Sequence, residues 1–413
     1  MPGFDCSVVR SEFPSLERGI IYLDNAASTL KPRRVVEAMR EFSYTSYANV
    51  HRGVHTLSME ASKRYEDAHE TVGRLVGGSW DEIVFVRNTT EAMQLAALSL
   101  ALNGVLRGGE VIVTEADHHS TLLPWVRAAR LGGASVKLLP VDDRGVPRWD
   151  LLGELLSEKT RVVAFGHVSN VTGAVAPVED IAKAARSVGA LVVLDSAQGV
   201  PHLPVDFRGM GVDIAAFSGH KMLGPTGIGV LWARRDLLEE LEPPLGGGGT
   251  VSRVRLSPSG GVSIEWDEPP WKFEAGTPPI IEAIGLAEAA EMLREIGMSE
   301  IARHEDFLTE KTMKLLEPLH EEGVIRYVGP SSPGERHGIV SFVARGRNPD
   351  EIGLLLDRRG IAVRTGLHCA HILHDRLGVP EGSVRASFYI YNCPSDVEAL
   401  ATALEDILLR KTR

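Results

Sequence analysis

The sequence predicts an α/β fold with a mostly parallel sheet between helices, and a second, smaller α+β domain. Short β-branched segments alternate with amphipathic segments from residue 82 onward, which is the pattern of repeated βαβ units. A chain of 413 residues is also too long for one ordinary core. We expect a large cofactor-binding domain over 20–280 and a small domain formed by 1–19 and 281–413, which carries the loop around Cys369.

The strands and helices of the large domain follow one another along the chain. We expect strands at 82–87, 110–116, 161–168, 190–197, 212–219 and 227–233, and helices at 90–102, 120–131 and 178–188. Several of these strands end in polar residues. Because open α/β sheets bind ligands outside the carboxyl ends of their strands, those polar residues are the first candidates for a functional site.

A glycine-rich passage, "PPLGGGGTVSRVRLSPSGGVS" (243–263), interrupts the pattern. We interpret it as a surface loop, since runs of glycine rarely persist inside regular elements. For the smaller domain we expect helices at 280–297, 300–319 and 395–410, and strands at 338–344 and 385–391.

Composition excludes several classes of partner. The chain has 44 Lys and Arg against 55 Asp and Glu, a net charge of −11, which favours neither nucleic acid nor an anionic membrane. The first residues lack a basic segment followed by an apolar one, and no stretch of about 20 apolar residues occurs, so we expect a cytoplasmic protein. Cys6, Cys369 and Cys393 are odd in number and far apart, which does not describe a disulfide framework.

Lys221 is the first candidate for chemistry. In "FSGHKMLGPTGIG" it follows an apolar run and precedes a Pro/Gly turn, so its amine can lie in a constricted pocket at a strand end. Desolvation there lowers the pKa of an amine and frees it for Schiff-base chemistry. A lysine beside a turn is more often solvated, and the neighbouring residues have to decide between the two interpretations.

Other polar residues at strand ends suit a ring-shaped, phosphorylated cofactor. Asp195 in "VVLDSAQ" can pair with a protonated ring nitrogen, with Gln198 in reach of the same ring, although Asp in this position is also a common helix N-cap. His118 can stack on an aromatic ring or move protons, or it is simply a surface histidine. Four residues are candidates for contacts to a phosphate, two of them at a helix start: Thr89, Thr90, Ser218 and His220.

Motifs along nearly the whole chain resemble the class V aminotransferase superfamily, and within it the type II cysteine desulfurases and selenocysteine lyases. They are "LDNAAST", "NVHRGVHTLS", "RNTTEA", "ADHHS", "HVSNVTG", "LDSAQ", "FSGHKMLGPTG", "FEAGTP", "RTGLHCA" and "RASFYIYN". The resemblance implies a fold-type I enzyme with a seven-stranded-type sheet, pyridoxal 5′-phosphate as cofactor, and a homodimer with its site at the subunit interface.

The resemblance also implies roles for single residues. Lys221 matches the lysine that binds the cofactor and later moves the substrate's Cα proton, and His118 matches the residue stacked on the ring. Asp195 matches the partner of the ring nitrogen, and Gln198 the contact to the ring hydroxyl. The phosphate contacts are matched by Thr90, Ser218, His220 and, from the other subunit, Thr277. The grip on the amino-acid substrate is matched by Asn170 and Arg385.

Cys369 falls at the position of the family's nucleophile. We expect its thiolate to attack the sulfur or selenium of the substrate, leaving alanine and a persulfide or released selenium. A thiol with a pKa of about 8.5 is only a few per cent ionised at neutral pH, so a nearby cation raises the reactive fraction. Arg364, also a candidate for substrate binding, and His368 can provide that charge. A sulfur-acceptor protein, such as one of the iron–sulfur assembly machinery, is then implied.

Alternatives to this interpretation stay open. His368, Cys369, His371 and His374 could ligate zinc, although adjacent residues rarely point to one ion and we expect no metal. Another class V enzyme, in which Lys221 does all proton transfer, or a non-enzymatic sulfur-carrier scaffold are further alternatives. The chain departs from the family pattern at Leu367, where a second histidine is common, and at Pro279, where asparagine is common.

Overall fold

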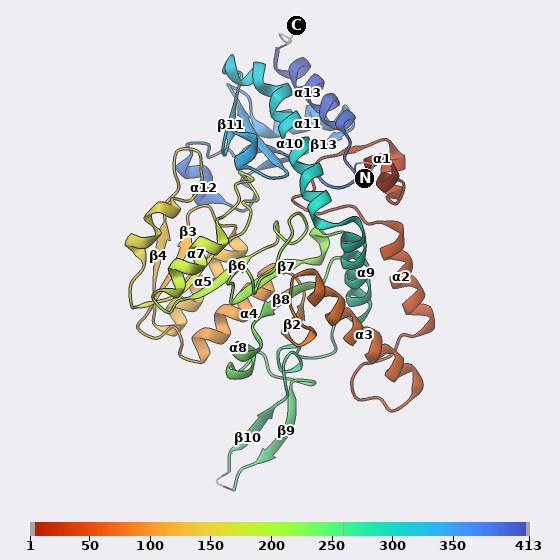
Figure 1. Cartoon of the computed structure of the whole chain (residues 1–413), viewed down its shortest axis with the longest axis vertical. Coiled ribbons are helices and arrows are strands. Elements are labelled where there is room, and N and C mark those ends of the chain that lie inside the picture. The colour runs from red at the N-terminus through yellow and green to blue at the C-terminus, as the bar shows by residue number, and fades with distance from the viewer. Residues whose placement is uncertain (1–4, 259, 410–413) are drawn as a thin grey trace.

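The computed structural model describes residues 5–258 and 260–409, and a seven-stranded sheet forms the centre of its larger part (Figure 1). The strand order is β2-β8-β7-β6-β5-β3-β4. The strands are β2 (Ile83–Val86), β3 (Glu110–Thr114), β4 (Ser135–Leu139), β5 (Thr160–Gly166), β6 (Leu191–Asp195), β7 (Ile214–Ser218) and β8 (Gly229–Ala233). Strands β3 to β7 pair in parallel, and β8 runs antiparallel to both its neighbours. The predicted α/β class is confirmed.

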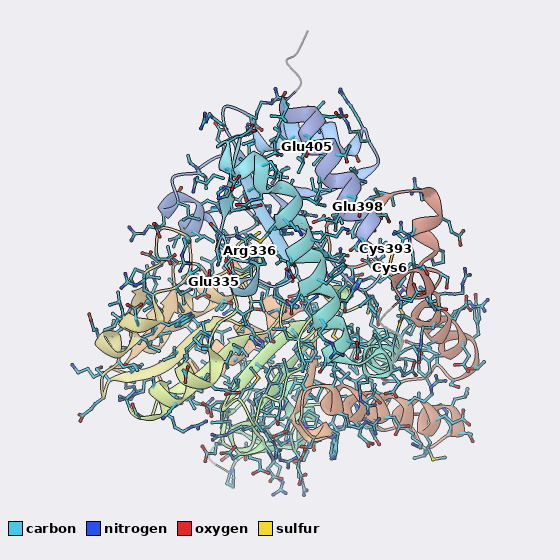
Figure 2. The ribbon with its side chains drawn as sticks, turned by 45° about the horizontal axis from the view of Figure 1, so that its top comes forward. Cys6, Glu335, Arg336, Cys393, Glu398 and Glu405 are labelled. Atoms are coloured by element: carbon cyan, nitrogen blue, oxygen red, sulfur yellow. A yellow bond between two sulfur atoms is a disulfide. The ribbon has the colours of Figure 1, made fainter. Side chains whose placement is uncertain are left out.

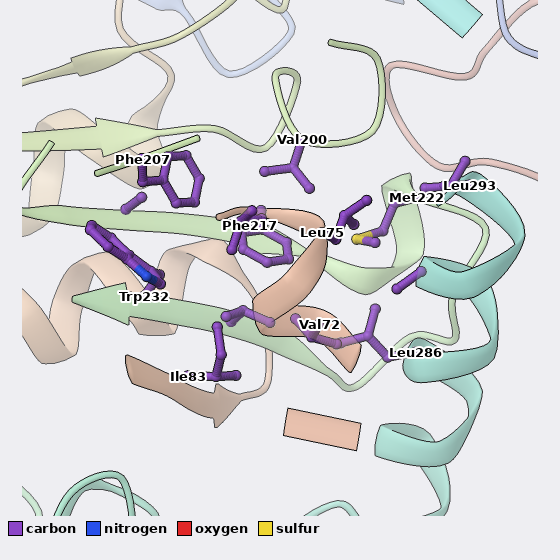
Figure 3. Packing of buried hydrophobic residues seen from close by; sticks show 14 of the residues in the cluster. Val72, Leu75, Ile83, Val200, Phe207, Phe217, Met222, Trp232, Leu286 and Leu293 are labelled. Carbon is purple, nitrogen blue, oxygen red and sulfur yellow. The ribbon is translucent and has the colours of Figure 1, made fainter. Parts of the chain in front are cut away.

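Side chains of successive strand residues enter two different hydrophobic cores, one on each face of this sheet. In β2, Phe85 packs in the first core and Val84 in the second, as the two-residue period of a strand requires. The first core is covered by α2 (Arg33–Thr45), α3 (Thr56–Leu75), α7 (Val178–Arg186) and α9 (Ile280–Ile296). Figure 3 shows Leu286 and Leu293 of α9 near Val72 and Met222. The second core is covered by α4 (Thr89–Leu102), α5 (His119–Gly132) and α8 (Arg235–Glu240).

A four-stranded antiparallel sheet with a third core forms the smaller part. Its order is β11-β12-β15-β14, with bounds Ile325–Val328, Ile339–Ala344, Ser383–Ser387 and Arg364–Gly366. Its helices are α10 (Met298–Glu321), α11 (Pro349–Asp357), α12 (His371–Arg376) and α13 (Pro394–Leu409). The strand predicted at 385–391 ends at Ser387, because Tyr389 and Tyr391 turn into the first core.

The N-terminal segment joins both parts. Strand β1 (Ile21–Tyr22) pairs in parallel with β13 (Ile361–Ala362) of the smaller part, whereas α2 packs on α9. The domain division at residue 280 stays a prediction. A short helix, α6 (Leu152–Leu155), lies between β4 and β5. Among the helices of the described residues, none has both the length and the apolar character that crossing a membrane requires.

A disulfide joins Cys6, at the start of α1 (Cys6–Arg10), to Cys393 (Figure 2). The two residues are 387 positions apart in sequence, but their Cα atoms are 5.6 Å apart. The spacing argument against disulfides is therefore wrong for this pair, because the fold brings the two ends of the chain together. Arg10 supports the junction, since its guanidinium lies 2.9 Å from the carboxylate of Asp396. Cys369 is free and exposed.

The glycine-rich passage contains a β-hairpin that extends away from the molecule (Figure 1, bottom). Strands β9 (Val251–Leu256) and β10 (Val262–Trp266) pair antiparallel, with Val254 opposite Ile264. The expected loop is thus wrong over these strands. The abundance of glycine concealed two short segments in which β-branched and polar residues alternate, a pattern that favours strands.

Candidate active site

A cavity of about 350 Å³ lies at the carboxyl edge of the parallel strands. The turns after β3, β5, β6 and β7 form its base, and the loop between β14 and α12 closes one side. Every residue predicted for catalysis, cofactor or substrate except Thr277 lines it: Thr89, Thr90, His118, Asn170, Asp195, Gln198, Ser218, His220, Lys221, Arg364, Cys369 and Arg385. Side chains from distant parts of the sequence therefore meet at one place.

Lys221 ends a single 3-10 turn, Gly219–Lys221, that directly follows β7. Burial lowers the pKa of its amine to about 8, against the opposing effect of the Asp195 carboxylate, and the positive charge of Arg385 lowers it further. An amine with this pKa is partly unprotonated near neutral pH. It is therefore able to attack a carbonyl carbon.

Asp195 lies at the end of β6 and accepts hydrogen bonds on both carboxylate oxygens. Ser120 Oγ and Thr121 Oγ1 each donate to Oδ2 at 2.8 Å, and the amide of Ala197 donates to Oδ1 at 3.0 Å. These bonds orient an almost fully buried carboxylate toward the cavity. Sequence reasoning missed Ser120 and Thr121, although both follow the "ADHH" segment and lie at the start of a helix.

His118 is the N-cap of α5, and its Nδ1 accepts a hydrogen bond from the amide of Ser120 at 3.0 Å. Burial lowers the pKa of His118 to about 4, so the ring is neutral at pH 7. The preceding Asp117 fixes this turn, because its carboxylate accepts from the amide of Thr114 at 2.7 Å and from that of Gly166 at 3.0 Å. A flat, neutral and firmly held imidazole suits stacking on an aromatic ring.

The start of α4 and the end of β7 form the predicted phosphate site. The hydroxyl of Ser218 accepts a hydrogen bond from the amide of Thr89 at 2.9 Å and lies 2.7 Å from the hydroxyl of Thr89. The sequence suggested that the amides at this helix start are free, but the amide of Thr89 is not. Thr90, by contrast, is exposed and lines the cavity. Burial lowers the pKa of His220 to about 4, so this ring is neutral at pH 7 and offers a hydrogen-bond donor or acceptor rather than a charge.

Gln198 has one satisfied and one unsatisfied group. Its Nε2 donates to the carbonyl of Ala26 at 2.6 Å, while its Oε1 is buried without a hydrogen-bond partner. A buried acceptor without a donor costs free energy. The orphaned oxygen therefore indicates that a hydroxyl or amine group from a ligand belongs in this cavity.

The backbone of the Cys369 loop is held in an unusual conformation. His368 has φ of 46° and Cys369 has φ of 56°, in the left-handed region that residues with a Cβ rarely adopt. Two hydrogen bonds hold this conformation: the amide of His119 donates to the carbonyl of Cys369 at 2.9 Å, and Asn170 Nδ2 donates to the carbonyl of His368 at 2.8 Å. The thiol itself remains exposed.

The histidines around Cys369 do not surround one point. Burial lowers the pKa of His368 to about 2, and its Nε2 lies 3.1 Å from the hydroxyl of Ser383, so His368 provides no imidazolium to the thiol. His374 Nδ1 donates to the carbonyl of Ala370, and the ring of His371 packs against that of His119. In the described part of the chain, no group of three or more His, Cys, Asp or Glu side chains could hold a metal ion.

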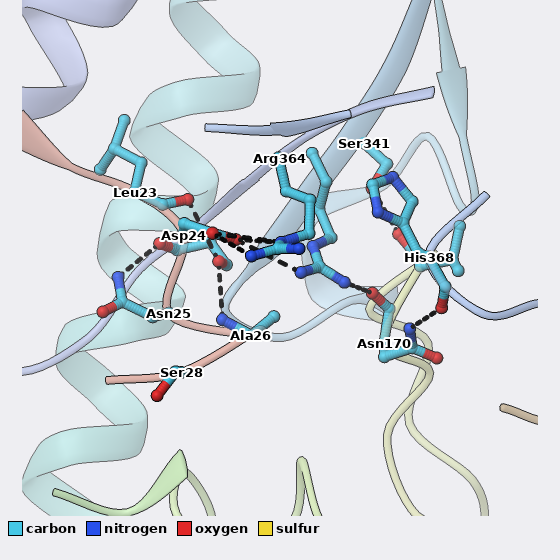
Figure 4. A network of polar contacts seen from close by, with 12 residues as sticks. Leu23, Asp24, Asn25, Ala26, Ser28, Asn170, Ser341, Arg364 and His368 are labelled. Carbon is cyan, nitrogen blue, oxygen red and sulfur yellow. Dashed lines mark hydrogen bonds and ion pairs between the residues drawn. The ribbon is translucent and has the colours of Figure 1, made fainter. Parts of the chain in front are cut away.

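Two arginines face the cavity and share one carboxylate (Figure 4). Arg364 donates to Asp24 from Nε at 3.0 Å and from Nη2 at 2.8 Å. Arg385 is buried; its Nη1 donates to the carbonyl of Asn170 at 2.8 Å, its Nη2 lies 3.5 Å from Asp24, and its Nε has no partner. Burial lowers the pKa of Arg385 to about 10, which still leaves it charged. Asp24 received no role from the sequence, although it lies in "LDNAAST".

Thr277 lies apart from the cavity. It is exposed and lines a separate hollow together with Arg87, Glu91 and Phe273. None of the other predicted site residues lines this second hollow. Its role toward a second subunit stays a prediction.

The fold and this cavity define a pyridoxal-phosphate enzyme of the class V aminotransferase family, to which the chain belongs. The family pattern described as Aminotransferase class-V matches residues 21–400. Within the family, the chain belongs with the cysteine desulfurases. It is 80% identical over 408 residues to a probable cysteine desulfurase of Aeropyrum pernix, covering 99% of each chain. It is 41% identical over 421 residues to the cysteine desulfurase of Haloferax volcanii, covering 97% of this chain and 96% of the other.

Two solved structures share the fold over almost the whole chain. The apo cysteine desulfurase from Thermococcus onnurineus NA1 superimposes with a TM-score of 0.91 at 39% identity, covering 98% of each chain. The cysteine desulfurase CsdA from Escherichia coli does so with a TM-score of 0.87 at 38% identity, covering 98% of this chain and 99% of the other. These likenesses confirm the type II resemblance, the α/β fold and the class of reaction.

The residues in the cavity fit the family's cofactor. The orphaned Oε1 of Gln198 can accept a hydrogen bond from the ring hydroxyl, and the carboxylate of Asp195 suits a protonated ring nitrogen. The exposed start of α4, with Ser218 beside it, suits a phosphate. Each polar group of pyridoxal 5′-phosphate thus has a candidate partner of matching chemistry.

Proposed function

We propose that Cys369 takes the sulfur of L-cysteine, so that the products are L-alanine and a persulfide on Cys369. One observation carries this proposal: the exposed thiol of Cys369 lines the same cavity as the amine of Lys221 and the guanidinium of Arg385. The left-handed backbone at Cys369, held by the amide of His119, keeps the thiol at this rim. A thiol meant only for packing needs neither exposure nor a constrained loop.

Each residue has a distinct task in this reaction. Lys221 would hold the cofactor, and its amine would accept the Cα proton of the substrate, for which a pKa of about 8 is suitable. His118 would stack on the ring of the cofactor, Asp195 would stabilise the protonated ring nitrogen, and Gln198 would accept a hydrogen bond from the ring hydroxyl. Pyridoxal 5′-phosphate, when bound, supplies an electron sink for the substrate carbon that loses its proton.

Arg385 fixes the substrate by its carboxylate. A guanidinium binds a carboxylate with two parallel hydrogen bonds, and Arg385 has an unused Nε donor in the cavity wall. Asn170 orients this arginine through its backbone carbonyl and holds the Cys369 loop through its side chain, so that one residue aligns both. Arg364, paired with Asp24, lines the same cavity as Cys369 and places a guanidinium on that side of it.

The sulfur transfer balances without a further reactant. The thiolate of Cys369 attacks the substrate's sulfur, so that a new S–S bond forms while the Cβ–S bond breaks. The electron pair of the broken bond stays with the carbon, which takes a proton and becomes the methyl group of alanine. The persulfide then lies on an exposed loop, from which a sulfur-acceptor protein, such as one of the iron–sulfur assembly machinery, can remove it.

We also propose a homodimer that shares its active sites. Thr277 does not line the cavity of its own chain and is exposed, as expected of a residue that contributes to the partner's phosphate site. The β9–β10 hairpin is the second support. Val254, Leu256, Val262 and Ile264 lie on one face of it, since they form directly opposite pairs two residues apart, and all four are exposed.

The decisive experiment measures alanine formation from L-cysteine and from L-selenocysteine, with saturating cofactor, by the wild type and by Cys369→Ala. We expect cysteine turnover to fall at least about a hundredfold, because the nucleophile is lost. Selenocysteine turnover should largely survive, because the C–Se bond is weaker than the C–S bond: selenium can be released in elemental form while the bonding electron pair stays with the carbon, which takes a proton to give alanine. Cofactor absorbance should be unchanged, which separates lost chemistry from lost binding. Undiminished cysteine turnover in the variant would show that Cys369 is not the nucleophile.

A further inference from the structure

The carbonyl oxygen of His220 belongs to the peptide bond that leads into Lys221, and it is surrounded by donors. The amide of Thr29 donates to it at 3.0 Å and Lys31 Nζ at 3.0 Å. Two hydroxyls also reach it, Ser28 Oγ at 3.1 Å and Thr29 Oγ1 at 3.2 Å. A carbonyl oxygen has only two lone pairs, so four surrounding donors more than saturate it. They therefore hold the His220–Lys221 peptide in one orientation.

The same segment also holds the chain on the other side of Lys221. The hydroxyl of Thr29 accepts a hydrogen bond from the amide of Leu223 at 2.9 Å while it donates to the carbonyl of His220. Leu223 has φ of 68°, a left-handed conformation that a leucine adopts only under constraint. Residues 28–31 thus hold the chain on both sides of Lys221, at the carbonyl of His220 just before it and at the amide of Leu223 two residues after it.

Lys31 is the unusual member of this bracket. Its side chain is half-buried, and this burial lowers the pKa of its amine to about 8. In the described part of the chain it forms no ion pair, and its hydrogen bond goes to a single neutral carbonyl. Burying an ammonium group without a carboxylate costs free energy, so the contact needs a compensating benefit. The three other donors to the same oxygen are neutral, which makes Lys31 the strongest of the four.

We propose that Lys31 is a positioning residue for Lys221: it fixes the His220–Lys221 peptide and so directs the Lys221 side chain into the cavity. This inference rests on the proposed role of Lys221 as the residue that binds the cofactor. Lys31 does not line the cavity, and it acts only through the backbone. Just before Lys31 in the sequence, the carbonyl of Ala26 accepts a hydrogen bond from Gln198. Residues 24–31, the first part of which is shown in Figure 4, therefore position both Gln198 and Lys221.

The test compares Lys31→Met with Lys272→Met. Methionine keeps the length of the side chain and removes the donor. Lys272 is the control, because its side chain is even more buried and its Nζ likewise donates to one backbone carbonyl, that of Glu239 at 2.9 Å, but it does not line the cavity. Two quantities are measured: the affinity of the cofactor-free protein for pyridoxal 5′-phosphate, and the fraction of Lys221 that borohydride links to it, mapped by peptide mass.

We expect Lys31→Met to weaken cofactor affinity about tenfold, the effect of losing one charge-assisted hydrogen bond, and to reduce the linked fraction of Lys221. Lys31→Arg should restore most of both, and Lys272→Met should stay within about twofold of wild type. The thermal midpoints of the two cofactor-free Met variants should be alike. Wild-type affinity and linkage in Lys31→Met would overturn the proposal, as would an equal loss in Lys272→Met.

Two further variants keep the test decisive. If Lys31→Met does not fold, Thr29→Val, which removes the bridging hydroxyl at nearly constant shape, is judged by the same two quantities. Lys221→Ala tests the foundation separately. If borohydride still links the cofactor to one particular lysine in Lys221→Ala, the proposed role of Lys221 fails, whatever Lys31 does.

Discussion

At Cys369 the side chain and the backbone obey opposite constraints. The thiol is exposed, whereas the backbone around it is fixed by His119, by Asn170 and by the burial of His368. A persulfide formed there can be reached from outside without any movement of the loop. If the proposed reaction holds, the resting structure already exposes the position from which an acceptor would take the sulfur.

His337 and Glu305 form a buried pair that the proposed reaction does not use. Nε2 of His337 lies 3.2 Å from Oε2 of Glu305, as an ion pair rather than a well-aligned hydrogen bond, and Nδ1 lies 2.7 Å from Asp306. His202 contacts the other oxygen of Glu305 at 3.0 Å. Burial opposes protonation of His337, but its contacts to Asp306 and Glu305 outweigh this and raise its pKa to about 9.

Stability should therefore depend on pH through His337. Its pKa is raised from 6.5 to about 9 in the folded protein, so the stabilisation is complete below pH 6.5 and is lost as pH rises through 9. We expect the free energy of unfolding to fall by about 2–3 kcal/mol over this window in the wild type. His337→Asn should lack this step, and His371→Asn, at an exposed histidine, should keep it. Denaturation midpoints from pH 6 to 10 measure it, and a step that persists in His337→Asn would refute it.

At the scale of elements, the β9–β10 hairpin should be needed for dimerisation. Leu256 is 86% exposed and Val262 64%, and the two are directly opposite each other. We expect Leu256→Asp with Val262→Asp to convert the dimer to monomer in sedimentation velocity and to lower cofactor affinity, since Thr277 would then lose its partner. Leu131→Asp, at a 70% exposed leucine on α5, is the matched control. A monomeric wild type, or a dimer unchanged in the variant, would contradict the proposal.

Elements were predictable from the sequence where burial has a simple period. The six predicted strands of the large sheet each overlap an observed one, because their buried residues form short apolar runs, and α4, α5 and α7 follow from helical spacing. Strand β4, by contrast, is half exposed and was missed. The hairpin was missed because glycine dominates its surroundings. A local pattern of buried residues predicts an element, but a segment whose residues are half or largely exposed, such as β4 or the hairpin, carries no such pattern.

The same limit applies to the site. Lys221, Asp195 and Cys369 were found because their residue types suit the chemistry at the ends of recognisable elements. Asp24 and Lys31 were not, because their partners lie 189 to 361 residues away in the sequence and carry no local signal. Residues that contact the substrate or cofactor can be recognised from motifs. Residues that position other side chains can be recognised only from the folded structure.

At the scale of the whole molecule, the Cys6–Cys393 bridge should stabilise the fold. We expect Cys6→Ser with Cys393→Ser to lower the free energy of unfolding by about 2–5 kcal/mol, as for other structural disulfides, and a reductant to bring the wild type to the same value. Cys369→Ser, at the free cysteine, is the control and should leave stability unchanged. Equal denaturation curves for the wild type and the double variant, both without reductant, would show that the bridge contributes nothing.

The bridge has a topological consequence as well. With it closed, residues 6–393 form a covalent ring that contains all the described strands and every residue of the cavity. A single backbone cut anywhere in that ring, even in the protruding hairpin, still leaves one molecule. The segment 24–31, which carries Asp24 and Lys31, then cannot diffuse away from Lys221 and Cys369. A nicked enzyme therefore retains all the parts of its active site for as long as the bridge stays oxidised.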